Sequence, residues 1–124
     1  MELLVWEDVE ATHVGGAEVR RANLGDVVAA RYVLPAGFDP SSRYAGLPDG
    51  LCPSAHLGEL LEGRLSVRFA DGTTQEIIAG SAFRLPRGHL ATAVEDSVLL
   101  EFTSTAEQHR KDQRLAERLA DALL

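Results

Sequence analysis

The chain has 124 residues, of which 45% are hydrophobic and 25% are charged, and its formal net charge is -7. This length supports one domain with a buried core but is too short for two domains. The acidic charge argues against a surface that follows nucleic-acid phosphates. The sequence also contains no run of about 20 apolar residues, which a helix needs to cross a membrane. From these two features we expect neither nucleic-acid binding nor a membrane span.

The single cysteine, Cys52, cannot form an internal disulfide, which is typical of proteins from reducing compartments. Residues 1–8 lack the basic start of a secretory signal peptide. All basic residues except Lys111 are arginines, and alanine is abundant, as in proteins from bacterial genomes rich in G and C. We therefore expect a cytoplasmic bacterial protein.

The first third of the chain reads as strands and turns. Residues 3–6 predict a short strand, and residues 13–16 predict a turn. Residues 17–34 are strand-like with a break at residues 25–26. Trp6 is the only tryptophan, and we expect it to pack in the core or in a subunit interface rather than to line a pocket.

A long loop follows these strands. Pro35 and Gly37 predict a turn, and residues 38–53 are rich in Gly, Pro, Ser and Asp. Two interpretations of this loop stay open, since long ordered loops often act as lids and others are simply surface connections. Tyr44 lies on this loop and would offer its hydroxyl to a ligand if the loop is a lid.

The middle of the chain carries the strongest turn signals. Residues 64–69 alternate polar and apolar side chains before the turn at residues 71–72, which predicts a β-hairpin. Gly63 breaks the chain just before this hairpin, because glycine accepts a positive φ. Residues 83–86 form a short apolar segment that ends at Pro86, and residues 91–102 predict a further strand. The fold class is therefore predicted to be all-β.

The glycine and proline spacing adds a resemblance to a family. The pattern Gly80-x5-Pro86-x-Gly88 matches the second motif of the cupins, and Gly63, seven residues after His56, fits the end of their first motif. The chain thus resembles the cupins, which are double-stranded β-helices of the jelly-roll type. The resemblance implies a cupin barrel over residues 1–103 and, because cupins commonly dimerise, a homodimer.

The departures from the cupin motifs concern the metal ligands. The four usual ligand positions fall on Gly50, Cys52, His56 and Ala91, and none keeps its usual residue. The patterns Cys-x3-His and Pro-x-Gly-His instead resemble a divergent subgroup of small bacterial cupins. Cys52, His56 and His89 would be an atypical metal triad for zinc, iron, copper or nickel, with an open position for substrate.

Without a metal, His56 and His89 would act as a general acid and base, because imidazole gives and takes protons near neutral pH. A cysteine nucleophile is the weaker hypothesis, since Cys52 and His56 would lie roughly 13 Å apart on an extended strand unless the chain bends at Pro53. No carboxylate is expected in the barrel. The residues expected to line the pocket are Tyr32, Tyr44, Leu60 and Ala91.

Two functions follow from these residues. The first is an enzyme that binds a small polar metabolite inside the barrel, of the isomerase, lyase or cyclase type or a metal-dependent oxygenase. The alternative is a non-catalytic ligand-binding or regulatory cupin. Alternation along the strands points Arg68 and Arg84 outward, and His13 and His109 are given no role.

The tail predicts an amphipathic helix over residues 104–124, capped by Ser104 or Thr105 with an acidic Glu107 in its first turn. Its apolar stripe must pack on the barrel or on a partner subunit, which also favours a homodimer. The opposite, charged face is expected to be solvated. The stripe comprises Leu115, Leu119, Ala122, Leu123 and Leu124, and the charged face comprises Arg110, Lys111, Arg114, Glu117 and Arg118.

Overall fold

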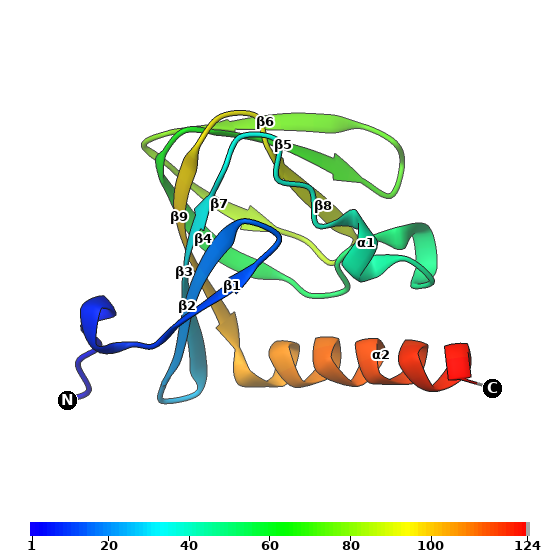
Figure 1. Cartoon of the computed structure of the whole chain (residues 1–124), viewed down its shortest axis with the longest axis horizontal. Coiled ribbons are helices and arrows are strands. Elements are labelled where there is room, and N and C mark those ends of the chain that lie inside the picture. The colour runs from blue at the N-terminus through cyan, green and yellow to red at the C-terminus, as the bar shows by residue number, and fades with distance from the viewer. Residues whose placement is uncertain (124) are drawn as a thin grey trace.

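A computed structural model describes residues 1–123 of the chain, with side chains described as far as Leu119. Two antiparallel β-sheets are followed by one long C-terminal helix (Figure 1). The predicted all-β jelly roll with a C-terminal helix is therefore confirmed. The elements are the 3-10 helix η1 (Trp6–Asp8), β1 (Ala11–Val14), β2 (Ala17–Leu24), β3 (Val27–Leu34), α1 (Ser41–Tyr44), the 3-10 helix η2 (Pro48–Gly50), β4 (His56–Glu62), β5 (Arg64–Phe69), β6 (Thr74–Ile78), β7 (Ser81–Leu85), β8 (His89–Ala93), β9 (Ser97–Ser104) and α2 (Thr105–Leu123).

The larger sheet has the strand order β1-β2-β3-β9-β4-β7, and the smaller sheet has the order β6-β5-β8. Side chains that alternate inward from both sheets form the core. Leu60 on β4 and Leu65 and Val67 on β5 are fully buried between the sheets. The outward residues Arg68 and Arg84 are exposed, as the alternation predicts.

The predicted turns are confirmed. The break at residues 25–26 separates β2 from β3, which pair in antiparallel register. The turn at residues 71–72 joins β5 to β6, and Gly72 has a φ of +84° there. Asp71 Oδ1 accepts hydrogen bonds from the backbone nitrogen of Thr73 at 2.9 Å and from its Oγ1 at 2.6 Å. The carboxylate of Asp71 thus closes the turn locally.

The first predicted strand is wrong. Residues 3–6 form no strand, and Trp6 starts the short 3-10 helix η1 instead. The first strand is β1, which pairs with β2 across a turn at Gly15 and Gly16, both at positive φ. Residues 3–6 are apolar but pair with no strand, so a strand there would leave its backbone groups unpaired. β1 instead pairs with β2, which follows it directly.

The single strand predicted over residues 91–102 is also wrong, because two strands occupy this run. β8 ends at Ala93 in the smaller sheet, and β9 begins at Ser97 in the larger sheet. Between them Asp96 Oδ1 accepts a hydrogen bond of 2.8 Å from the backbone nitrogen of Ala36. This polar turn lets the chain cross from one sheet to the other.

Helix α2 packs beneath its own barrel, against β3 and β9 (Figure 1). Ser104 Oγ accepts a hydrogen bond of 3.1 Å from the backbone nitrogen of Glu107, so the predicted cap is confirmed. Leu115 packs against the buried cluster formed by Tyr44, Leu51, Cys52 and Leu90, while Leu119 is 57% exposed. The stripe assignments for Ala122, Leu123 and Leu124 lie outside the described side chains. The homodimer stays a prediction.

The prediction that the charged face of this helix is solvated is wrong for three of its members. Lys111 is buried, with 4% of its surface exposed. Arg110 donates a hydrogen bond to the carbonyl of Pro53, and Arg118 donates to the carbonyls of Arg43 and Ala45. The charged face therefore holds down the long loop between β3 and β4. Within residues 1–123, no helix has the length and hydropathy needed to cross a bilayer.

Candidate metal centre

A short backbone pairing brings Cys52 beside His89. The backbone nitrogen of Cys52 donates to the carbonyl of His89 at 2.8 Å, and the backbone nitrogen of Gly88 donates to the carbonyl of Cys52 at 2.8 Å. Cys52 and His89 therefore sit opposite each other in an isolated antiparallel bridge. Both side chains are buried, with 3% and 4% exposed.

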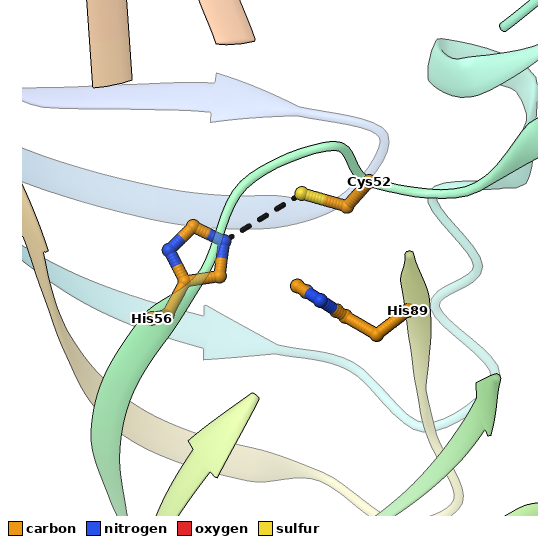
Figure 2. Close-up of side chains that lie close together, drawn as sticks. All are labelled: Cys52, His56 and His89. Carbon is orange, nitrogen blue, oxygen red and sulfur yellow. Dashed lines mark hydrogen bonds between the residues drawn. The ribbon is translucent and has the colours of Figure 1, made fainter. Parts of the chain in front are cut away.

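His56 joins this pair because the chain bends after Cys52 rather than continuing as a strand. β4 starts only at His56, and its Nε2 lies 3.6 Å from Cys52 Sγ (Figure 2). Cys52 and His56 are therefore not separated as they would be on an extended strand. The bend at Pro53, which the sequence analysis left open, is present. The start of α2 holds this bend, since Arg110 donates to the carbonyl of Pro53 and Glu107 Oε2 accepts from the backbone nitrogen of Ala55 at 3.1 Å.

Each histidine is held through its Nδ1 atom. His56 Nδ1 shares a hydrogen bond of 2.6 Å with Thr103 Oγ1 on β9. His89 Nδ1 donates to the carbonyl of Pro86 at 2.6 Å. The two rings meet edge to face, with centroids 5.2 Å apart. With Nδ1 of both histidines bound outside the cluster, Nε2 is the nitrogen left to coordinate a metal, which is the usual arrangement of metal-binding imidazoles.

The thiol of Cys52 has an unusual environment. Burial by itself would raise its pKa, but hydrogen bonds with His56 and His89 and the positive charge of Lys111 lower the pKa to about 4. Burial lowers the pKa of His89, yet the contacts with Cys52 outweigh burial, and the pKa is raised overall. These contacts therefore favour the thiolate form of Cys52 and the protonated form of His89.

A pH titration of the metal-free protein checks the state of the thiol. Since the pKa of Cys52 is lowered, the thiolate is expected to persist as pH falls from neutral and to disappear only near pH 4. An ordinary thiol would already be protonated below about pH 8.5. Ultraviolet thiolate absorbance, with a Cys52→Ser protein as the blank, measures this directly. A midpoint near the ordinary value would contradict the described environment.

The donor set fits a divalent transition metal. One ligand atom from each of Cys52, His56 and His89 lies within 4.8 Å of the others. A thiolate with two imidazole nitrogens suits zinc, iron, copper or nickel, and three protein ligands leave room for substrate. The three sequence candidates are thus brought together by the fold.

A cavity of about 530 Å³ extends from this cluster into the barrel. Tyr32, Tyr44 and Ala91 line it, as expected from the sequence, whereas Leu60 is fully buried in the core and is not among the lining residues. The cavity has the size of a small-molecule site. Its charged lining residues are Arg21, Asp39, Arg43, Glu101 and Lys111.

The sequence analysis assigned none of these five charged residues to the pocket, and two of them bear on the chemistry of the site. Glu101 overturns the expectation that no carboxylate lines the barrel. It faces inward on β9 with Leu99 and Thr103, and strict alternation from Leu99 would have found it. Lys111 lies one helical turn before Leu115 on the side of α2 that packs on the barrel, a spacing that was available in the sequence.

The two tyrosines of the cavity remain protonated at neutral pH. Burial, with the nearby charge of Glu101, raises the pKa of Tyr32 to about 12. Arg21 opposes this rise and donates a hydrogen bond of 3.1 Å to the hydroxyl of Tyr32. Burial, the charge of Cys52 and a hydrogen bond with Cys52 raise the pKa of Tyr44. Both hydroxyls therefore keep their protons and can donate hydrogen bonds, that of Tyr44 already to Cys52.

No family sequence model and no curated protein sequence matches this chain. Solved structures do match. An RmlC-like cupin from Shewanella frigidimarina has a TM-score of 0.64 at 17% identity, over 88% of this chain and 95% of that one. KdgF from Halomonas has a TM-score of 0.63 at 21% identity, over 84% and 94%. Oxalate decarboxylase OxdC from Bacillus subtilis has a TM-score of 0.64 at 16% identity, over 83% of this chain and 29% of that one.

Proposed function

Because the chain has the fold of a small cupin, we propose that it is a metal-dependent enzyme of the isomerase or lyase class that acts on a small polar metabolite. The observation that carries this proposal is the buried cluster of Cys52, His56 and His89, whose ligand atoms lie within 4.8 Å of one another beside a cavity. A thiolate and two imidazoles match a transition-metal donor set.

The three donor atoms narrow the choice of metal. Oxalate decarboxylase, which shares the fold, has Mn(II) centres. Manganese prefers carboxylate and water oxygens, whereas sulfur and imidazole donors favour zinc, iron, copper or nickel. We therefore propose one of these four metals for the cluster. A reducing, cytoplasmic setting would keep the Cys52 sulfur in the reduced state from which the coordinating thiolate forms.

A metal role for the two histidines is better supported than an acid–base role. Both Nδ1 atoms are occupied by Thr103 and Pro86, and His56 Nε2 points at the thiol of Cys52 rather than into open space. A general base needs a nitrogen within reach of the substrate. Proton transfer therefore falls to another group in the cavity.

Glu101 is the residue best placed for that transfer. It lines the same cavity, and its carboxylate makes no hydrogen bond or ion pair with the part of the chain that the structure describes. When bound, the metal would polarise a carbonyl or hydroxyl oxygen of the substrate. Glu101 would then take a proton from the neighbouring carbon, while Tyr32 and Tyr44 donate hydrogen bonds to substrate oxygens.

Exchange of carbon-bound protons with deuterated water tests this function, because isomerisation and elimination both begin with proton removal. Proton NMR of a panel of small hydroxycarbonyl compounds would follow the exchange. The proposal expects exchange that requires the metal and that falls about 100-fold or more in Glu101→Gln. Exchange that is absent for every compound, or that is equal in the metal-free protein, would contradict it.

Thr103 is expected to tune the metal site through His56. Thr103→Val keeps the side-chain shape but removes the partner of His56 Nδ1, so metal affinity should fall about 10- to 100-fold. Competition with a metal indicator measures this change. Thr92→Val is the matched control, because Thr92 lies in the smaller sheet and its Oγ1 donates only to the carbonyl of Ser66 in that same sheet. Equal affinities in the two variants would contradict the role given to Thr103.

A further inference from the structure

We propose that Lys111 of α2 anchors a carboxylate group of the ligand, so that the cavity takes a small organic anion. This inference deepens the proposed function, whose cavity it uses. It also makes the C-terminal helix part of the binding site. The anchor comes from a segment outside the two sheets, and α2 brings it to the cavity from beneath the barrel (Figure 1).

The argument starts from the burial of this ammonium group. Only 4% of Lys111 is exposed, and the residue lines the cavity. Within the described part of the chain its Nζ makes no hydrogen bond and no ion pair, and it lies over the ring of Tyr44, 5.6 Å from the ring centroid. A buried ammonium group that forms no ion pair is costly, and an anion bound in the cavity would offset this cost.

The surroundings of Lys111 have the chemistry of a carboxylate site. The hydroxyl of Tyr32 already accepts a hydrogen bond from Arg21, so its own proton is free to donate. Lys111, Arg21 and Tyr32 thus bring three kinds of donor to one cavity. A carboxylate has acceptor sites for several such donors at once.

Glu101 lines the same cavity but does not neutralise Lys111. No ion pair joins the two groups within 4.0 Å in the described residues, although both line the cavity. The ammonium nitrogen of Lys111 and the carboxylate oxygens of Glu101 are therefore more than 4.0 Å apart. An anion held by Lys111 at one end would place its reacting carbon toward Glu101 and the three candidate metal ligands.

A competing role for Lys111 is to balance the charge of the Cys52 thiolate, since its positive charge helps to lower the pKa of that thiol. The two roles differ in what the loss of Lys111 changes. A counter-charge for the thiolate would affect metal binding. A carboxylate anchor would affect the binding of organic anions and leave metal binding nearly unchanged.

The chain offers a direct probe, because Lys111 is its only lysine. Protein labelled with carbon-13 lysine gives one side-chain Cε signal, which reports on this ammonium group. Acetate, malonate and lactate would be titrated, with the neutral amide of each as the control ligand. Calorimetry would measure the affinities of the wild type, Lys111→Met and Arg114→Met, in both metal-free and metal-loaded protein. Arg114→Met removes the same charge from an exposed position on the same helix.

We expect at least one carboxylate, but not its amide, to shift the lysine signal in a saturable way. Lys111→Met should weaken that affinity about 10- to 100-fold, and Arg114→Met should leave it within about twofold. The inference fails if no carboxylate moves the signal, or if Lys111→Met binds the anion as tightly as the wild type. Carboxylate binding by a protein that takes up no metal would overturn the proposed function but not this inference.

Discussion

His56→Ala is expected to lower the affinity of the proposed site for a transition metal by at least about 100-fold. His56 supplies one of three donors, and its Nε2 lies 3.6 Å from the Cys52 sulfur. With this imidazole removed, the thiolate and His89 remain as a two-ligand site. Two protein ligands bind a metal far more weakly than three. Dialysis against a metal of known concentration, followed by elemental analysis, measures the difference.

The matched control for this prediction is His109→Ala. His109 is an exposed histidine on α2, so its loss should not change metal content. Thermal unfolding of both metal-free variants would show that each is folded before metal is added. A His56→Ala protein that keeps wild-type affinity would remove His56 from the ligand set.

Gly63→Ala is expected to lower the free energy of unfolding by about 3 kcal/mol or more, through two effects that add. Gly63 has a φ of +90°, which an L-residue resists. A Cβ atom at this position would also lie 2.3 Å from the carbonyl oxygen of Asp96 and 2.3 Å from Ser97 Oγ. The backbone oxygen cannot move aside without disturbing the turn by which the chain crosses between the sheets.

Gly72→Ala separates the two effects. Gly72 has a similar φ of +84°, but a Cβ atom there would meet nothing within 4 Å. Gly72→Ala should therefore lower the free energy of unfolding only by the cost of the positive φ, about 1 kcal/mol. Chemical denaturation of the two variants beside the wild type measures both values. Equal destabilisation by the two substitutions would mean that the close approach at Gly63 has no energetic weight.

The turn residues made the fold predictable. Glycines at positive φ and Asp71 mark turns through local chemistry, which does not depend on distant parts of the chain. The same signals could not tell that residues 91–102 divide between two sheets, because that choice depends on the pairing of β8 with β5 and of β9 with β3 and β4. Strand partners are set by the whole barrel.

The candidate site was predictable in part for the same reason. Cys52, His56 and His89 stand out by type and spacing, and the Cys52–His89 bridge brings them together. The bend that brings His56 to Cys52 depends on Glu107 and on Arg110, about fifty residues away in the sequence. Local patterns carry no information about such contacts.

Lys111 shows where residue type misleads. Its charged neighbours led to the prediction that it is solvated, although its place four residues before Leu115 indicates the packed side of α2. The structure buries it because α2 lies against the barrel where the cavity opens, and the long side chain reaches past the helix surface. The position of a helix on a sheet decides which of its charged residues are exposed.

The electronic spectrum of the cobalt-substituted protein would show whether the Cys52 thiolate binds the metal. Cobalt(II) occupies zinc-type sites, and coordination by sulfur produces an intense near-ultraviolet charge-transfer band. We expect the band to appear with one equivalent of cobalt, to vanish in Cys52→Ser, and to persist in His109→Ala. A wild-type protein that binds cobalt without this band, or a Cys52→Ser protein that retains it, would contradict a metal centre built on Cys52, His56 and His89.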